Sequence, residues 1–317
     1  MPFGIEVFRY TESFGRRVVV GLSWDVVLIF AFVATFTFLI HFIVRDLLNP
    51  AEHTPREGEE TTEEIADSLE AQGIDEVPRF TAAQRASHWI MAISVFLLML
   101  SGFLIMNADV TVRTFLGVSW LVVHEVSAIV LIGYVFFHLG HVAWKGTWAE
   151  MWFGRRDAVD LWVRGKNLVG LADEYPRQFK YPSAQKLLHL GVTLTTLGLV
   201  VTGLVLLRRV QTPLWDTTRE FSFLGIEFGI GGTGLSSMGL VPWSFVIHDF
   251  LAVALLALVM GHVYFALRPN EWAITRSMVT GTVSARAYAE KYSPTSWSVS
   301  RTASTDGGEP EVADEDD

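Results

Sequence analysis

Five long apolar runs alternate with polar segments along the chain. Each run holds few or no charged residues over roughly 20 positions, which is enough for a helix to cross the hydrocarbon core of a bilayer. The runs predict an all-α integral membrane protein of the plasma membrane, with a four-helix transmembrane bundle preceded by one extra N-terminal transmembrane helix. The expected spans are Trp24–Phe42, His88–Met106, Leu121–Trp144, Leu187–Leu207 and Phe245–Leu267.

The polar segments set the expected organisation of the chain. We divide it into an N-terminal transmembrane segment (residues 1–46), an acidic linker (47–80), a four-span domain (81–297) and an acidic tail (298–317). The linker and the tail are rich in Asp and Glu, a composition typical of segments without fixed structure. We therefore expect neither of them to be folded.

Basic residues favour one side of the predicted membrane domain. Eight lie in the loop of about residues 145–186, and four more follow the last span, at residues 268–291. Both regions lie on the same face of the membrane, and the positive-inside rule places that face in the cytoplasm. It follows that the 47–80 linker is cytoplasmic and that Met1 lies outside.

The composition narrows the possible chemistry. The net charge is −10, and only five of the 24 basic residues are lysine, which favours a halophilic protein that works in high salt. Two disordered acidic segments would explain the acidic residues but not the scarcity of lysine. Neither interpretation favours nucleic-acid binding. The absence of cysteine excludes disulfides, thiolate-bound iron–sulfur clusters and covalently attached haem within this chain.

Histidines recur inside the apolar runs at a fixed spacing. His248 and His262 lie 14 residues apart in the last span, and His124 and His138 repeat that spacing in the third. Fourteen residues of α-helix rise about 21 Å and end within roughly 40° of the starting direction. One histidine in an apolar helix is more often a buried, hydrogen-bonded residue than a ligand. Two equally spaced pairs on separate helices favour a functional role.

Paired imidazoles on facing helices suit b-type haem, which takes one axial ligand from each of two helices. Two haems at different depths would use ligands near each membrane face. His248, His262 and His124 are the main candidates, and His88 and His138 compete for the fourth position. Other residues fit supporting roles: the small Gly102, Gly133, Gly203 and Gly261 for close packing, and Arg208, Arg209, Arg85, Lys186 and Arg268 for the haem propionates.

The order of several segments resembles a known family, the cytochrome b (gamma) subunit of membrane-bound, quinone-linked formate dehydrogenases. The resemblance covers about residues 79–297, and no single motif in it is highly specific. The segments that carry it are Arg85-Ala86-Ser87-His88-Trp89, His124, Lys180-Tyr181-Pro182-Ser183-Ala184-Gln185-Lys186, Val201-Thr202-Gly203, the His248 and His262 pair, and a tail from Gly281 to Trp297.

The resemblance implies a ligand set that spacing alone does not. It pairs His88 with His262 at an inner haem and His124 with His248 at an outer haem, whereas the spacing would pair His138 with His262. It also implies a quinone site beside the inner haem, near Tyr181, Gln185, His189 and His262. Here Pro182 and Ala184 replace the family's Asn and Gly, so the hydrogen bonds at that site must differ.

As a function, the resemblance implies a respiratory-chain electron-transfer subunit. An iron–sulfur subunit and a catalytic subunit, of the molybdenum type, would deliver electrons through two b-type haems to menaquinone or a related quinone. The chain itself shows no substrate-oxidising site. One alternative is the cytochrome b of a hydrogenase or another molybdoenzyme. An alternative of a different class is a haem-free protein that conducts protons or ions through membrane histidines.

Overall fold

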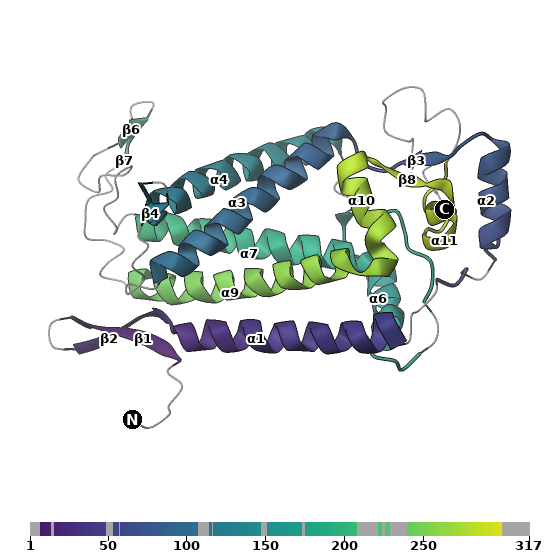
Figure 1. Cartoon of the computed structure of the whole chain (residues 1–317). Coiled ribbons are helices and arrows are strands. Elements are labelled where there is room, and N and C mark those ends of the chain that lie inside the picture. The colour runs from purple at the N-terminus through teal and green to yellow at the C-terminus, as the bar shows by residue number, and fades with distance from the viewer. Residues whose placement is uncertain are drawn as a thin grey trace. The chain divides into compact units, whose positions relative to one another are not determined.

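The structure is a computed structural model (Figure 1), and it describes residues 7–13, 16–48, 53–56, 58–106, 114–115, 117–146, 151–172, 175–207, 221–223, 226–228 and 240–299. Five long helices account for the five apolar runs, and each is long and apolar enough to cross a membrane. They are α1 (Trp24–His41), α3 (Ala82–Met106), α4 (Trp120–Lys145), α7 (Ser183–Leu207) and α9 (Leu240–Leu267).

The remaining described elements are short. The helical ones are a π-helix at Phe42–Leu48, α2 (Thr62–Ala71), α6 (Arg155–Leu168), a 3-10 helix at Pro269–Glu271, α10 (Trp272–Thr280) and α11 (Ala285–Lys291). The strands form two-stranded antiparallel ladders: β1 (Phe8–Ser13) with β2 (Arg16–Leu22), β3 (Glu76–Pro78) with β8 (Thr282–Ser284), β4 (Thr114–Phe115) with β5 (Val118–Ser119), and β6 (Phe221–Phe223) with β7 (Ile226–Phe228).

The chain divides into two compact units that cut across the long helices. The first unit holds Met1–Phe36, Ile90–His141 and Gly191–Met260, and the second holds Thr37–Trp89, Val142–Leu190 and Gly261–Asp317. Within the most apolar stretch of each span, only 6% to 17% of the residues are buried by the chain itself. The other apolar side chains face outward, as lipid tails require. The backbone polar groups of such a helix are already hydrogen-bonded within the helix, so none is left unsatisfied in the lipid.

The core of the first unit is built between four spans. Val95 of α3, Leu131 of α4 and Leu255 of α9 are its buried centre, and Val192 and Leu199 of α7 pack against it. Small residues let α7 approach α9 closely, as is common between membrane helices. A β-carbon added at Gly198 would lie 2.6 Å from a terminal methyl of Leu251, so a larger residue there would displace that side chain.

A β-hairpin that the sequence analysis did not predict precedes α1. Strands β1 and β2 form it, and it contacts α9 through one carboxylate. Asp249 accepts hydrogen bonds from the Arg9 guanidinium and from the backbone N–H of Leu22, both at 3.0 Å. A β-carbon on Gly21 would lie 2.2 Å from the Asp249 carboxylate, so only glycine allows this approach.

The second unit contains a folded module where the sequence analysis expected an unstructured linker. The prediction was wrong for residues 60–78, because four apolar residues in that acidic segment are buried in one hydrophobic cluster. Ile65 and Leu69 of α2, with Ile74 and Val77, pack into one cluster that the C-terminal segment completes with Val283, Tyr288, Ala289, Tyr292 and Trp297. Figure 1 shows α2, β3, β8 and α11 together in this module.

The ends of two helices in this unit are fixed by capping boxes. Thr61 and Glu64 cap α2 reciprocally, the arrangement that satisfies free backbone N–H groups at a helix start. Thr81 and Gln84 do the same for α3, with bonds of 2.9 and 3.2 Å. Helix α3 therefore begins at Ala82, six residues earlier than expected, which places His88 in its second turn.

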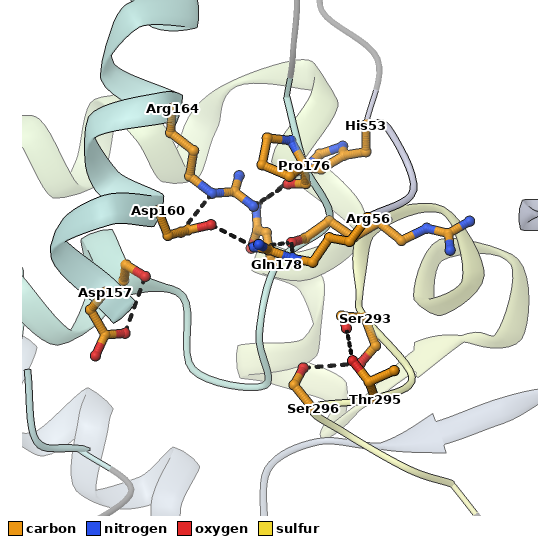
Figure 2. Close-up of polar contacts among 12 residues, drawn as sticks. His53, Arg56, Asp157, Asp160, Arg164, Pro176, Gln178, Ser293, Thr295 and Ser296 are labelled. Atoms are coloured by element: carbon orange, nitrogen blue, oxygen red, sulfur yellow. Dashed lines mark hydrogen bonds and ion pairs between the residues drawn. The ribbon is translucent and has the colours of Figure 1, made fainter. Parts of the chain in front are cut away.

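Buried ion pairs tie the connecting segments of the second unit together (Figure 2). The fully buried Arg177 lies 3.6 Å from a Glu59 carboxylate oxygen and donates to the backbone carbonyl of Glu60. Asp160 of α6 pairs with Arg56 at 2.5 Å and with Arg164 at 3.0 Å. Breaking one buried pair leaves an uncompensated charge, so each strongly constrains the fold.

The C-terminal end of the extra span is bonded to the last span within the second unit. The phenol of Tyr264 hydrogen-bonds His41 Nδ1, and its ring stacks on Phe38 with centroids 4.7 Å apart. Asp46, in the π-helix, pairs with Arg268 at 2.6 Å. These contacts give α1 specific partners on α9 rather than lipid contacts alone. The expected tail from residue 300 onward lies outside the described residues.

Candidate haem-binding sites

Two of the predicted histidines meet in the first unit. His124 projects from the first turns of α4 and His248 from α9, and their ring centroids are 6.5 Å apart with an interplanar angle of 59°. Both side chains are largely removed from water. The two imidazoles therefore face each other from separate helices, as axial ligands of one iron must.

Hydroxyl groups from the other two spans fix the protonation pattern of both rings. Ser101 of α3 lies 2.9 Å from His124 Nδ1, and Thr202 of α7 lies 2.8 Å from His248 Nδ1. Each hydroxyl already donates its single hydrogen to a backbone carbonyl four residues earlier, at 2.6 and 2.8 Å. With its hydrogen in that bond, the hydroxyl accepts from the imidazole, an arrangement that puts the ring proton on Nδ1 and leaves the Nε2 lone pair free for a metal.

A glycine follows each of these hydroxyl residues. A β-carbon on Gly102 would lie 3.4 Å from His124 Cε1, and one on Gly203 would lie 3.5 Å from His248 Cε1. A larger side chain at either position would fill the space beside the ring. The two glycines keep this side of each imidazole open for a flat macrocycle.

The second pair lies in the second unit. The rings of His88 on α3 and His262 on α9 have centroids 6.3 Å apart and an interplanar angle of 62°. His88 Nδ1 is buried and has no hydrogen-bond partner among the described residues. A buried imidazole nitrogen without a partner is costly, and a metal or a cofactor group is one way to satisfy it.

The spacing within both pairs fits one metal ion between two imidazoles. A metal–imidazole bond is about 2 Å long, so two rings bound to opposite sides of one iron have centres roughly 6 Å apart. The observed 6.3 and 6.5 Å agree with this value. Both pairs thus have the ring spacing that one iron between two imidazoles requires, and the open glycine positions add to this at the His124–His248 pair.

His138, the competing histidine of α4, and the nearby His141 have aromatic neighbours on their own helix. The ring of His138 stacks on Tyr134 with centroids 5.7 Å apart, and that of His141 stacks on Phe137 at 5.8 Å. His41 uses both ring nitrogens in hydrogen bonds, to Tyr264 and to the Leu168 carbonyl.

The predicted quinone residues occupy the start of α7. Tyr181 lies just before the helix, with the Lys180 ammonium 5.4 Å from its ring centre. Gln185 and His189 follow one turn apart in the first two turns, in the same unit as His88 and His262. Arg208 and Arg209, predicted to contact haem propionates, lie outside the described residues.

Two hydroxyl residues beside the His124–His248 pair, and the glutamate that follows His124 in the sequence, were not predicted from the sequence. Ser101 and Thr202 hold the rings, and the repeated hydroxyl–glycine dipeptides Ser101-Gly102 and Thr202-Gly203 are the signal that could have found them. The third is Glu125, whose two carboxylate oxygens are buried without a hydrogen-bond partner in the described part of the chain.

Helices of membrane-crossing length that carry histidines in facing pairs define a class, the membrane cytochromes b. Comparison with known proteins agrees. The model of the prokaryotic cytochrome b561 family matches residues 79–281, well over half of the chain. The chain belongs to this family. It is a multi-pass protein of the plasma membrane, and its family implies b-type haem.

Curated relatives point to one kind of cytochrome b. The chain is 25% identical over 226 residues to the cytochrome b556(fdo) subunit of formate dehydrogenase from Escherichia coli strain K12, which covers 69% of this chain and 91% of the relative. The same subunit of E. coli O6:H1 (strain CFT073) and of E. coli O157:H7 matches with the same identity and coverage. The resemblance found in the sequence is therefore confirmed.

Proposed function

We propose that this chain is a dihaem electron-transfer subunit that links an iron–sulfur partner to a membrane quinone, as in formate dehydrogenase complexes. His124 and His248 would hold one haem, and His88 and His262 the other. The observation that carries the proposal is the presence of two imidazole pairs whose ring centres are 6.5 and 6.3 Å apart on facing helices. Bound haem would supply one-electron oxidation and reduction.

The chain's own residues would position and insulate these groups. Ser101 and Thr202 accept from Nδ1 of their histidines, which keeps Nε2 available and makes each imidazole a stronger electron donor. The apolar spans around both pairs exclude water, so the histidines stay neutral and able to coordinate metal. These residues bind and insulate haem and do not oxidise a small-molecule substrate. Oxidation of the substrate would therefore belong to a partner subunit.

A quinone would bind at the start of α7. Tyr181, Gln185 and His189 offer donors and acceptors for the two quinone carbonyls, in the same unit as the His88–His262 pair. Reduction to quinol takes up two protons and two electrons, and the protons would come from the cytoplasm. Menaquinone or a related quinone fits this role.

The proposed partners follow from the relatives. The matched E. coli proteins are cytochrome subunits of formate dehydrogenase, and a subunit of this kind works in a complex. We infer an iron–sulfur subunit on the outer face and a catalytic subunit of the molybdenum type. Isolation of the intact complex, followed by identification of its subunits, would separate this assignment from a hydrogenase or another molybdoenzyme.

A haem count with single-histidine variants tests the ligand assignment. The purified chain should bind two haems with b-type bands in its reduced-minus-oxidised spectrum. His248→Ala should lose one haem and His88→Ala the other, because each removes one of two axial ligands.

The matched control is His138→Ala, which removes a histidine from the same bundle and should leave both haems in place. If His138→Ala loses a haem and His88→Ala keeps both, the proposed pairing is wrong. A colourless chain would instead support the haem-free alternative.

A further inference from the structure

Helix α6 buries its polar side and exposes apolar residues, the reverse of a helix on the surface of a water-soluble protein. Its buried positions are Asp157, Asp160, Arg164 and Asn167, which repeat every three or four residues along one side and are all polar. A helix that packs on a protein in water normally buries its apolar side and exposes its polar side. Here the arrangement is reversed.

The buried polar side is fixed to the protein by specific bonds (Figure 2). Asp157 pairs with Lys186 at 3.2 Å, and Ser183 donates to the same carboxylate at 3.1 Å. Asp160 pairs with Arg56 and with Arg164, and Figure 2 shows these side chains converging between α6 and the following segment. The helix cannot rotate its apolar side inward without breaking these bonds.

The outward side carries large apolar residues. Trp162 is 69% exposed and Val159 59%, and Trp152 and Leu171, which flank the helix, are 76% and 77% exposed. Such values match the lipid-facing surface of the spans, where Phe136 of α4 is 72% exposed. Helix α6 has 14 residues and several charges, so it is too short and too polar to cross a bilayer.

The neighbouring sequence holds α6 close to the membrane. Nine residues (146–154) connect it to the end of α4, and fourteen (169–182) connect it to the start of α7. Its first two residues, Arg155 and Arg156, are exposed cations. Tryptophan and arginine together are typical of the headgroup layer, where indole rings rest at the interface and guanidinium groups reach phosphate.

Helix α10 repeats the pattern in the same unit. It follows α9 after a single 3-10 turn, its one buried residue is Ser277, and Trp272, Val279 and Arg276 are exposed. Two short helices next to membrane spans thus turn tryptophan outward and a polar residue inward.

We propose that α6 is an interfacial helix whose apolar side lies in the headgroup and upper acyl layer of an anionic leaflet. Its lipid-facing residues are Trp152, Val159, Trp162 and Leu171, and Arg155 and Arg156 bind lipid phosphates. The partner of this surface is the lipid bilayer itself. The inference uses the membrane class of the chain and does not depend on haem ligation.

The absence of cysteine allows a direct test on the full chain. Two variants would each carry one nitroxide label on the exposed side of α6: Trp162→Cys and the smaller change Ala158→Cys. Each labelled chain would be placed in vesicles of phosphatidylcholine and phosphatidylglycerol. Power-saturation EPR would compare collisions with oxygen, which concentrates in lipid, and with a water-soluble nickel chelate. The matched control is Asp67→Cys, an exposed position on the acidic helix α2.

We expect both α6 labels to favour oxygen over the nickel chelate by several-fold relative to the α2 label. Labels on α6 that behave like the α2 label would overturn the proposal. Exclusion of both reagents, or dipolar broadening between labels of two copies, would also overturn it, because either would mean that protein covers this side.

Discussion

Ser101 and Thr202 show how single hydroxyl groups can set the electronic character of a metal ligand. Each gives its hydrogen to its own helix and accepts the Nδ1 proton of a histidine on another helix. An imidazole whose Nδ1–H is engaged in this way is a better electron donor to iron and favours the oxidised form. In the sequence this role is marked only by the repeated hydroxyl–glycine dipeptides, a weak signal because Ser and Thr are common within membrane helices.

Removing either hydroxyl should raise the midpoint potential of the haem held by His124 and His248. For Ser101→Ala or Thr202→Val we expect a rise of about 20–60 mV, which corresponds to one net hydrogen bond of about 0.5–1.5 kcal/mol. A spectroscopic redox titration measures it.

The matched controls for this prediction are Ser94→Ala and Thr195→Val. These residues make the same bond to their own helix, at 2.8 Å in both cases. They should leave both potentials unchanged. Equal shifts in the control variants would indicate a general effect on helix packing instead.

His53 should make the second unit, which holds the α2 module, sensitive to acid. Burial, together with nearby cations such as Lys291 and Arg164, lowers the pKa of His53 to about 2. The imidazole is thus neutral in the folded chain but protonates below about pH 6.5 when unfolded. The unfolded state then binds more protons, so stability falls as the pH drops below that value, by up to about 1.4 kcal/mol per pH unit.

Hydrogen exchange of α2 and α11 between pH 7.5 and 5.5 would measure this loss, after correction for the intrinsic pH dependence of exchange. A His53→Gln variant should show a flatter profile. An unchanged slope in that variant would assign the acid sensitivity to other groups.

At the scale of elements, apolar periodicity predicted the long helices well and the short elements poorly. Each of the five spans was placed to within six residues at its start, because about 20 apolar residues in a row leave few alternatives to a helix. Helix α2 was missed because acidic residues dominate its composition, while its two buried residues, Ile65 and Leu69, make a weak signal. The partner that completes their core lies about 200 residues later.

The four histidines show the same limit at the candidate sites. The 14-residue spacing favoured His138 as the partner of His262. That choice was unreliable because spacing within one helix carries no information on which helices face each other. The family resemblance implied His88, and the structure places His88 beside His262. Ligation itself stays a prediction until haem is counted in the variants.

Leu69→Ala should loosen α2 from the C-terminal segment. Removing this buried side chain from the cluster with Val77 and Tyr292 should cost about 2–4 kcal/mol of local stability. Limited proteolysis of the full chain would then cut within residues 60–78 faster than in the parent. Glu63→Ala, at an exposed position of the same helix, should cut at the parental rate, and similar rates in all three proteins would contradict the observed packing.

At the scale of the whole molecule, the chain's orientation can be tested. The basic loops predict that the α2 module is cytoplasmic and that the hairpin before α1 lies outside. A membrane-impermeant maleimide should label Val7→Cys in intact cells and Asp67→Cys only after permeabilisation, since both positions are exposed. The reverse pattern would invert the topology and would place the proposed iron–sulfur partner on the opposite side.

The hydroxyl bonds at the His124–His248 pair also imply an order of events during biogenesis. The ligands come from α4 and α9 and their hydroxyl partners from α3 and α7, so all four spans contribute to one pair. A chain that enters the membrane from its N-terminus completes this set only when α9 arrives. Under the proposed ligation, cofactor insertion at this pair is a late step, and a nascent chain stalled before residue 240 offers haem no finished site.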